Sequence, residues 1–501
     1  MLRKIRVTLA IICFILTAFL FLDFTGTFHA WLGWLAKIQF VPALLALNVG
    51  LVLSLILLTF FFGRVYCSVI CPLGVFQDTI SWVAAKRKKN RFSYSPAIPW
   101  LRYVVLVLFI LSLILGISSV FTLLEPYSAF GRMMSTLVAP LYQLGNNALA
   151  YFAERMDSYA FYSYDILLKS TIIISISGIT LIALVVLAWR NGRTYCNTIC
   201  PVGTVLGFIS YFSLFRPVFN LEKCNGCGSC ARNCKASCIN QKTHTIDYSR
   251  CVTCLNCIEK CNKSAITYAP RKINFKKKTE ISQDTVLSMR KDDSSRRSFL
   301  SISTLFALTS VLKAQEKKVD GGLAVIEDKI MPNRDTAIVP PGALSLRNMA
   351  QHCTACQLCI SVCPNKVLQP SDSLTKFMQP EMTFERGYCR PECIKCSEVC
   401  PTSAINLISK ADKSAIQVGH AVWIKKNCVV LTDGVSCGNC ARHCPTSAIQ
   451  MVPSDSEKAD SAKIPVVNVE RCIGCGACEN LCPARPFSAI YVEGHQMHRI
   501  I

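Results

Sequence analysis

Four apolar stretches dominate the first two hundred residues of the chain, at positions 5–24, 40–62, 101–124 and 166–189. Each is long enough to cross the hydrocarbon core of a bilayer, which takes about 20 helical residues. The first stretch also resembles a secretory signal, but no small-residue cleavage site follows it and three further stretches do. The pattern therefore predicts an α-helical membrane domain over residues 1–215, built as a bundle of four transmembrane helices.

Basic residues are unevenly distributed between the loops that join these stretches. Arg3, Lys4 and Arg6 precede the first stretch, and six basic residues lie between positions 64 and 91. The other two loops hold fewer basic residues or offset them with acidic ones. Because loops rich in Lys and Arg stay in the cytoplasm, both ends of this domain are expected on the cytoplasmic side of a bacterial inner membrane.

Cysteine-rich segments follow the apolar ones. Residues 216–270 hold eight regularly spaced cysteines and residues 346–490 hold sixteen, out of 30 in a chain of 501 residues. Disulfide scaffolds are short secreted domains, so metal binding is the better explanation in a long chain with membrane spans. The formal charge of +23 comes largely from Lys and Arg beside the spans and in a linker, which favours a membrane surface over nucleic acid as partner.

The cysteines form runs of the C-x2-C-x2-C-x3-C type, which bacterial ferredoxins use to bind [4Fe–4S] clusters. In such a run, three cysteines on a tight loop bind one cluster and the fourth binds the neighbouring cluster. The first module, residues 216–270, is predicted to be an α+β ferredoxin-like domain with two clusters. Its runs are Cys224, Cys227, Cys230 and Cys234, then Cys251, Cys254, Cys257 and Cys261. Cys234 is expected to join the second run and Cys261 the first, with Cys238 as an alternative to Cys234.

The second module, residues 346–490, has four runs of this type, the inner two with a stretched first gap, and is predicted to be a four-cluster ferredoxin-like domain. Its runs are Cys353, Cys356, Cys359 and Cys363; Cys389, Cys393, Cys396 and Cys400; Cys428, Cys437, Cys440 and Cys444; and Cys472, Cys475, Cys478 and Cys482. We expect the two outer runs to pair with each other and the two inner runs likewise. Zinc sites favour separated cysteine pairs, often with histidine, so the spacing favours about six [4Fe–4S] clusters over zinc or disulfides.

Three segments join the two modules: a basic linker at 271–294, a short apolar segment at 295–315 and a second linker at 316–345. The apolar segment begins with Ser295-Arg296-Arg297-Ser298-Phe299-Leu300, which looks like a twin-arginine export signal. The alternative is a chance Arg-Arg pair ahead of a surface helix. Export would place the second module in the periplasm, with the segment retained as an anchor.

A shorter motif occurs twice in the membrane domain. Residues 63–74 and 192–203 share the pattern Gly-Arg-x-Tyr-Cys-x3-Cys-Pro-x-Gly. In a helix, the two cysteines of each copy lie one turn apart on the same face. Cys67, Cys71, Cys196 and Cys200 are therefore candidate cofactor-binding residues, as metal ligands, as disulfides or as redox thiols. The alternative is that they are four small buried apolar residues.

Several common cofactor motifs are missing from the sequence. It has no C-x-x-C-H haem motif, no Gly-x-Gly-x-x-Gly and no P-loop, and His29 is the one histidine close to a span. We therefore expect neither haem nor nucleotide. No residue is predicted to be catalytic, and a substrate-reducing centre is expected on a partner protein.

The combination of motifs resembles two known families. Residues 1–270 resemble the NapH-type membrane ferredoxins, with four spans, two C-x3-C-P motifs and a two-cluster ferredoxin. Residues 295–490 resemble the NapG or MauM-type periplasmic ferredoxins, with the twin-arginine segment, Pro340-Pro341-Gly342-Ala343 and four cysteine runs. The chain departs from both by joining them in one polypeptide. It also has Lys235 and Asn262 after the fourth cysteines of the first module, where proline is usual.

The resemblance implies a quinol dehydrogenase module, which takes electrons from the quinone pool and passes them to a periplasmic reductase, typically of nitrate, or to a cytochrome. Two alternatives stand beside it. Proteins of the cbb3-oxidase accessory type share the features of the first 270 residues and act in metal delivery. The third interpretation is a cytoplasmic polyferredoxin that is tethered to the membrane.

Overall fold

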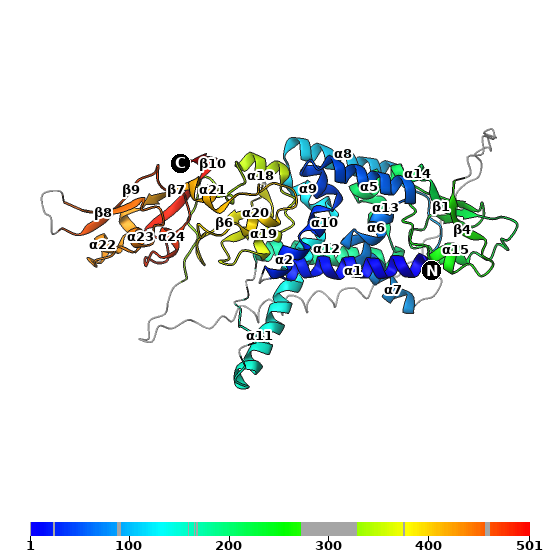
Figure 1. The fold of residues 1–501 in the computed structure, drawn as a ribbon, viewed down its shortest axis with the longest axis horizontal. Helices are drawn as coiled ribbons and strands as arrows, with labels where there is room; N and C mark the ends of the chain where they lie inside the picture. Colours follow the sequence, from blue (N-terminus) through cyan, green and yellow to red (C-terminus); the bar gives the residue numbers. More distant parts are fainter. Residues whose placement is uncertain are drawn as a thin grey trace, which may run out of the picture.

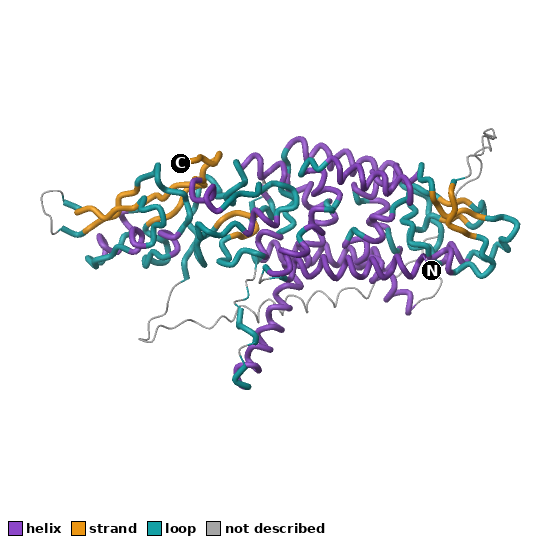
Figure 2. The backbone as a smooth tube through the Cα atoms, in the orientation of Figure 1, coloured by secondary structure: helices purple, strands orange, loops and turns teal. Residues whose placement is uncertain are grey.

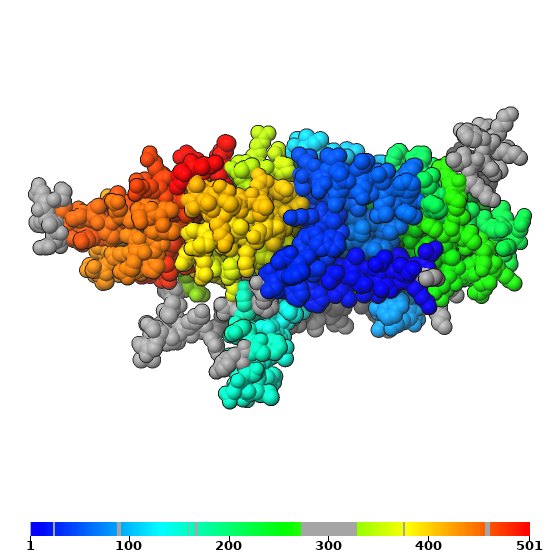
Figure 3. Space-filling view, viewed as in Figure 1, coloured from blue at the N-terminus to red at the C-terminus, as the bar shows by residue number. Residues whose placement is uncertain are grey.

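The computed structural model describes residues 2–501, apart from 24–25, 88–91, 159, 165, 167–168, 272–327, 374–375 and 456–460. The predicted twin-arginine segment at 295–315 lies outside the described residues. The molecule is elongated, with a helical domain in the middle and one cysteine-rich module at each end (Figure 1, Figure 3). The first module, in green, and the second, in yellow to red, are therefore separated by the length of the helical domain.

The helical domain contains two helices that are long and apolar enough to cross a membrane: α1 (Leu2–Leu22) and α12 (Thr171–Asn191). They correspond to the first and fourth predicted spans. Helix α1 runs along the long axis of the molecule, as does α8 (Pro99–Leu115) (Figure 1). Two of the four predicted transmembrane helices, α1 and α12, thus have the length and composition of a membrane span.

The second and third predicted spans are not single helices, so the sequence prediction of continuous helices is wrong there. The second is divided into α4 (Phe40–Leu45) and α5 (Val49–Phe62), because Leu47 adopts a positive φ of 53° and the Asn48 side chain caps α5 by accepting from Leu51 N. The third is divided into α8 and α9 (Ser118–Leu124) at Gly116, whose φ is 71°. Hydropathy alone does not register such local breaks.

Shorter helices complete the domain. They are α2 (Thr27–Leu32), α3 (Trp34–Lys37), α6 (Val65–Val69), α7 (Pro72–Arg87), α10 (Pro126–Met133), the π-helix η1 (Met134–Val138), α11 (Ala139–Arg155), α13 (Thr194–Thr198) and α14 (Pro201–Tyr211). The order α5–α6–α7 recurs as α12–α13–α14, which is the structural form of the repeated motif. In both copies a glycine with positive φ ends the long helix and a proline begins the last helix.

The first module consists of short elements (Figure 2). These are β1 (Phe215–Phe219), α15 (Ser229–Arg232), β2 (Ile239–Asn240), β3 (Thr245–Ile246), α16 (Asn256–Glu259) and β4 (Ile266–Pro270). Strand β1 pairs antiparallel with β4, and β2 pairs with β3. The module follows α14 directly, so its β1–β4 sheet is joined to the end of the helical domain.

The second module has three further antiparallel pairs, β5–β6, β7–β10 and β8–β9. Its elements are α18 (Leu346–His352), α19 (Leu358–Ser361), β5 (Leu368–Pro370), β6 (Pro380–Met382), α20 (Lys395–Val399), α21 (Lys410–Ala415), β7 (Ile416–Trp423), the 3-10 helix η3 (Lys425–Asn427), α22 (Val429–Thr432), α23 (Asn439–Arg442), β8 (Ile449–Pro453), β9 (Lys463–Val467), α24 (Ala477–Asn480) and β10 (Ile490–Ile500). The longest pairing, β7 with β10, brings the last strand back to the middle of the module.

Polar contacts fix each module to its own end of the helical domain. At the first module, Arg250 donates to Ser95 O over 2.7 Å and Arg3 donates to Asn256 Oδ1 over 3.0 Å. At the second module, Lys169 donates to Gln357 Oε1 over 2.6 Å, as does Ser135 over 2.7 Å. The two modules are thus docked at opposite ends rather than side by side (Figure 1).

Candidate iron–sulfur sites

The second cysteine run of the first module surrounds a small cavity. Cys251, Cys254 and Cys257 line it together with Cys234 and Cys238. The Sγ atoms of Cys234 and Cys238 lie 3.5 Å apart, and this hydrogen bond lowers the pKa of Cys234 to about 7. The structure therefore brings Cys234 to the run that the spacing predicted, with Cys238 next to it as a second candidate for the fourth ligand.

The first run of this module is more exposed. The Cys230 thiol interacts electrostatically with Cys224 and Cys227. Ser229, beside Cys230, donates to Lys260 O over 3.2 Å, which brings the residue before Cys261 to this loop. The backbone N–H of Ala265 donates to Cys261 Sγ over 3.2 Å. Both runs thus have a loop of three cysteines and one cysteine from across the module.

Neighbouring runs pair in the second module, so the predicted nesting of outer with outer and inner with inner is wrong. The Cys400 thiol interacts with those of Cys353, Cys356 and Cys359. Conversely, Cys363, the fourth cysteine of the first run, lines one cavity with the three loop cysteines of the second run, Cys389, Cys393 and Cys396. Runs one and two therefore form one two-cluster unit.

Runs three and four form the other unit. Cys444 interacts with Cys472 and Cys475. Cys482 lines a cavity with the three loop cysteines of the third run, Cys428, Cys437 and Cys440. The physical reason is local: the fourth cysteine lies just past its own loop and reaches the loop that packs against it, which is that of the adjacent run.

The cysteine sets fit a cluster better than a single ion. A zinc ion needs its thiolates within about 2.3 Å of one point. No three His, Cys, Asp or Glu side chains come close enough to share one ion anywhere in the part of the chain that the structure describes. The sets instead line cavities, as a cubane with one iron atom at each thiolate requires.

The loop backbone also suits such a group. Ala355 and Gln357 have positive φ, as do Gly474 and Gly476 in the fourth run, so these loops curl around the cysteines. Backbone N–H groups donate to cysteine sulfur, for example from Ala489 to Cys482 over 3.3 Å. Burial raises the pKa of Cys359, so a bound metal is what would hold this thiol as a thiolate. When bound, [4Fe–4S] clusters supply one-electron transfer.

The four cysteines of the two C-x3-C-P motifs also come together. Each is at most 5% exposed, and the thiols of Cys71 and Cys200 each interact electrostatically with those of Cys67 and Cys196. All four are free, and no disulfide joins them. The sequence suggested that the two thiols within each copy share a helix face, whereas the convergence of the two copies is decided by the packing of the repeats.

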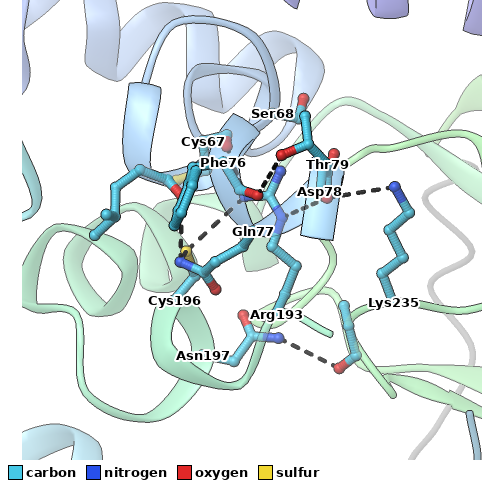
Figure 4. A network of polar contacts seen from close by, with 12 residues as sticks. Cys67, Ser68, Phe76, Gln77, Asp78, Thr79, Arg193, Cys196, Asn197 and Lys235 are labelled. Carbon is cyan, nitrogen blue, oxygen red and sulfur yellow. Dashed lines mark hydrogen bonds and ion pairs between the residues drawn. The ribbon is translucent and has the colours of Figure 1, made fainter. Parts of the chain in front are cut away.

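Two fully buried arginines, Arg64 and Arg193, cross over between the two copies. Figure 4 shows Arg193 beside Asp78. Arg193 donates to Cys67 O over 2.7 Å and to Asp78 Oδ1 over 2.8 Å. Arg64 donates to Cys196 O over 3.1 Å and to Asn197 Oδ1 over 2.9 Å. These arginines were not predicted as site residues, although their presence in both copies of the motif was the available signal.

Taken together, the cysteine loops and short antiparallel strands define an iron–sulfur protein with 4Fe-4S ferredoxin domains. A family model described as a 4Fe-4S binding domain matches residues 44–91 and 176–221, which contain the two C-x3-C-P motifs. A second model, described as a 4Fe-4S dicluster domain, matches residues 435–485.

The chain belongs to the MauM ferredoxin-type family. It is 31% identical to the methylamine utilization ferredoxin-type protein MauM of Methylobacillus flagellatus over 166 residues, which are 32% of this chain and 70% of that protein. It is 29% identical to the ferredoxin-type protein NapF of Escherichia coli K12 over 159 residues, 32% of this chain and 87% of the relative. The putative electron transport protein YccM of the same strain is 24% identical over 226 residues, 42% of this chain and 54% of YccM. No solved structure matches significantly.

Proposed function

We propose that the protein is a membrane-bound electron carrier that oxidises quinol and passes the electrons through iron–sulfur clusters to a periplasmic reductase, such as nitrate reductase. The observation that carries this proposal is the placement of two cysteine-rich modules at opposite ends of one apolar helical domain (Figure 1). Such a molecule connects the two sides of a membrane with the quinone pool between them. The names of the relatives, which include an electron transport protein, support the electron-transfer part.

Embedding in a membrane is supported by the surface of the helical domain. In the most apolar windows of α1 and α12, only 28% and 22% of the residues are buried, whereas the core helix of a soluble protein would be mostly buried. Large apolar side chains also face outward on α8, such as Val107 and Ile114. Exposed Trp31 and Trp34 follow the end of α1, and Trp82, Trp100 and Trp189 belong to α7, α8 and α12. Such tryptophans are typical of membrane interfaces.

The expected sidedness follows from charge. Basic residues near the first module, including Arg3, Arg87 and Arg190, favour the cytoplasm for that end. The second module is then periplasmic, in agreement with the twin-arginine pattern at 295–300. In this arrangement α1, α8 with α9, α4 with α5, and α12 are the four spans of a multi-pass inner-membrane protein.

A cavity of about 60 Å³ at the junction with the second module marks our candidate quinol site. The cavity must widen to accept a whole ring, because a cavity that binds benzene has about 150 Å³. Phe21, Leu22 and Leu368 give it apolar walls, while Asp23 and Lys169 give it polar ones. Cys363, a predicted cluster ligand, also lines it. A quinol ring in this cavity would therefore lie beside the second module and at the end of α1.

Oxidation of a quinol releases two protons, and Asp23 and His29 are placed to receive them. His29 Nδ1 lies 3.0 Å from Asp23 Oδ2, so the Nδ1 proton is donated to the carboxylate. The other ring nitrogen, Nε2, is then the proton acceptor of the neutral imidazole. It is buried and has no hydrogen-bond partner among the residues that the structure describes. A partner molecule with an O–H group would satisfy it.

The test uses the full chain purified without oxygen in detergent. Menaquinol or ubiquinol is added, and reduction of the iron–sulfur clusters is followed by EPR. We expect reduction in the wild type and a rate at least about tenfold lower in Asp23→Asn, because His29 would lose the carboxylate that orients its ring and stabilises its protonated form. Asp157→Asn, a substitution at an exposed position just after α11, is the matched control and is expected to behave like the wild type.

The experiment distinguishes a failure of quinol oxidation from a failure of the proposed quinol site. No reduction of the wild type by either quinol would overturn quinol oxidation and favour a redox accessory factor. Unchanged rates in Asp23→Asn would overturn only the location of the quinol. A reporter fused after Ile501 tests sidedness: its export should be lost in Arg296→Lys/Arg297→Lys, and a reporter that stays cytoplasmic in the wild type would favour a tethered cytoplasmic polyferredoxin.

A further inference from the structure

The helical domain separates the two modules by a distance that electrons must cross. Helix α12, with 21 residues, is about 31 Å long at ~1.5 Å per residue. We propose that Cys67, Cys71, Cys196 and Cys200 hold one further [4Fe–4S] cluster, which relays electrons through this domain between the two modules. The metal site is inferred from the arrangement of the four cysteines and the buried arginines, and the relay rests on the proposed electron-transfer function.

Two independent helix breaks bring the four thiols near one another. Cys67 and Cys196 lie on the short helices α6 and α13, and Cys71 and Cys200 directly precede α7 and α14. Two glycines allow the close approach. A Cβ atom on Gly74 would lie 2.2 Å from Cys67 O, and one on Gly203 would lie 2.1 Å from Cys196 O. Each copy thus folds its two cysteines tightly around the same space.

The buried cations around the thiols favour a negatively charged group between them. Arg64 and Arg193 are completely buried, and each places a terminal guanidinium nitrogen near a sulfur atom, 3.8 Å from Cys67 Sγ and 3.9 Å from Cys196 Sγ. Arg64 Nε and Arg193 Nη2 have no hydrogen-bond partner among the described residues. Arg64 has no carboxylate among its hydrogen-bond partners, which are oxygen atoms of Asn197, Ser249 and Cys196 and the Cys67 sulfur.

Asp78 is the carboxylate that faces this site, and it is already shared. Arg193 donates to its Oδ1 over 2.8 Å, Arg6 donates to its Oδ2 over 3.1 Å, and Lys235 Nζ lies 3.4 Å from its Oδ1. Counting Arg64, four cations therefore face one carboxylate. Buried cations without counter-charge are costly, so neutral thiols would leave the site unbalanced. Four thiolates around a metal cluster supply the missing negative charge.

The alternative of four cysteines that only fill space does not explain the arginines. Free cysteine packs as a small apolar residue, and such a core would exclude charged groups rather than gather them. The family model that covers both motifs is also described as a 4Fe-4S binding domain. Charge, donor set and convergence therefore agree on a metal–thiolate centre.

Helices α6 and α13, which carry Cys67 and Cys196, lie between the two modules (Figure 1). On one side, Arg64 reaches Ser249 O over 3.3 Å and interacts electrostatically with Cys251 of the first module. On the other side, Tyr195 donates to Leu124 O over 3.1 Å, next to α10. Helix α10 carries Tyr127, which interacts with Cys356 and Cys400 of the second module. Packed residues thus connect the four-cysteine site with the cysteine runs of both modules.

The relay step is a simple exchange of one electron. A reduced cluster held by the cysteines of one module would give up one electron, the centre held by Cys67, Cys71, Cys196 and Cys200 would take it up, and a cluster held by the other module would then receive it. No bond forms and no proton is transferred. The electrons come from the quinol of the proposed function or, in the test, from dithionite.

The site is tested by counting iron and labile sulfide per chain in anaerobically purified full-length protein. Cys71→Ser and Cys200→Ser are each expected to lose about four iron atoms while the EPR signals of the ferredoxin clusters remain. Cys13→Ser is the matched control, because Cys13 is a half-buried thiol of α1 outside all cysteine sets. It is expected to keep the full iron content.

Equal iron content in the wild type and in both motif variants would overturn the site. If the motif variants fail to fold, the wild type decides: about 28 iron atoms per chain support seven clusters, whereas about 24 overturn the seventh. Loss of iron together with intact quinol-driven reduction of both modules would retain the site but overturn the relay. The quinol test above does not use these variants, so the two proposals fail separately.

Discussion

At the scale of single residues, the most informative feature is the pair of buried arginines between the two copies of the repeated motif. Arg193 contacts Asp78 and Cys67 O, and Arg64 contacts Cys196 O and Asn197. Each arginine therefore holds the backbone of the opposite copy. An arginine can do this because its guanidinium donates in several fixed directions at once, which a lysine cannot.

Arg193→Gln should destabilise the helical domain, because it leaves Asp78 with two cations and removes the bond to Cys67 O. Breaking a buried ion pair costs about 3–5 kcal/mol. The expected result is a clearly lower midpoint of thermal unfolding in detergent, followed by circular dichroism of the helices. Arg190→Gln, at an exposed position near the end of α12, should leave the midpoint unchanged. Equal midpoints for the two variants would mean that the crossed contacts are not stabilising.

At the scale of secondary-structure elements, positive-φ glycines connect the long helices to the cysteine-bearing ones. Gly192 has a φ of 71°, and a Cβ atom there would lie 2.5 Å from Lys235 O of the first module. Gly192 N donates to Ala188 O over 3.2 Å at the end of α12, and Arg193 N donates to the same Lys235 O over 2.9 Å. The helix break and the docking of the module therefore depend on one small residue.

Gly192→Ala should loosen the first module from the helical domain. The strained backbone costs about 1–3 kcal/mol, and the methyl group displaces Lys235. Hydrogen exchange over residues 230–250 is expected to become faster. Gly178→Ala in the middle of α12 is the control: nothing lies within 4 Å of its Cβ position, so it should stabilise the helix slightly and leave exchange unchanged. Identical exchange in both variants would contradict this dependence on Gly192.

The pairing of adjacent cysteine runs makes another prediction at this scale. The thiols of Cys356 and Cys400 interact in the structure and are assigned to one cluster, so Cys356→Ser/Cys400→Ser should lose about four iron atoms, no more than either single variant. Cys356→Ser/Cys482→Ser removes ligands of two clusters and should lose about eight. Iron analysis of the purified variants measures the difference. The reverse result would restore the nested pairing.

At the scale of the whole molecule, the two modules and the helical domain form one elongated body (Figure 3). Its apolar side chains are exposed along the helices between the modules, and its polar, cysteine-rich parts lie at the ends. This is the distribution expected of a molecule that spans a bilayer, as the proposed electron conduction along its long axis requires.

Proteoliposomes can measure that conduction. With ferricyanide enclosed and dithionite outside, the wild type should bleach the enclosed ferricyanide, because electrons have a path through the protein. Cys196→Ser should slow the bleaching at least about tenfold, equivalent to ~1.4 kcal/mol or more in barrier height. Cys13→Ser should bleach at the wild-type rate. Wild-type vesicles that bleach no faster than protein-free vesicles would contradict transmembrane conduction.

Local spacing was enough to predict much of this protein. Three cysteines two residues apart must lie on one loop, so runs such as Cys472 to Cys478 indicated cluster loops without knowledge of the fold. Uniform hydropathy likewise predicted α1 and α12. It did not reveal the breaks at Leu47 and Gly116, because these depend on the conformation of single residues inside an apolar stretch.

Tertiary structure alone decided which distant loops meet. Cys400 belongs with Cys356, and Cys67 belongs with Cys196, because of how the loops and repeats pack, and no spacing within a run encodes that choice. The burial of Arg64 and Arg193 could not be predicted from the sequence either, because an arginine that follows a membrane span is usually an exposed charge at the membrane interface. The sequence by itself determined what each short segment can bind, because chain connectivity limits local geometry. The fold determined which segments bind together, because that depends on contacts between residues far apart in the chain.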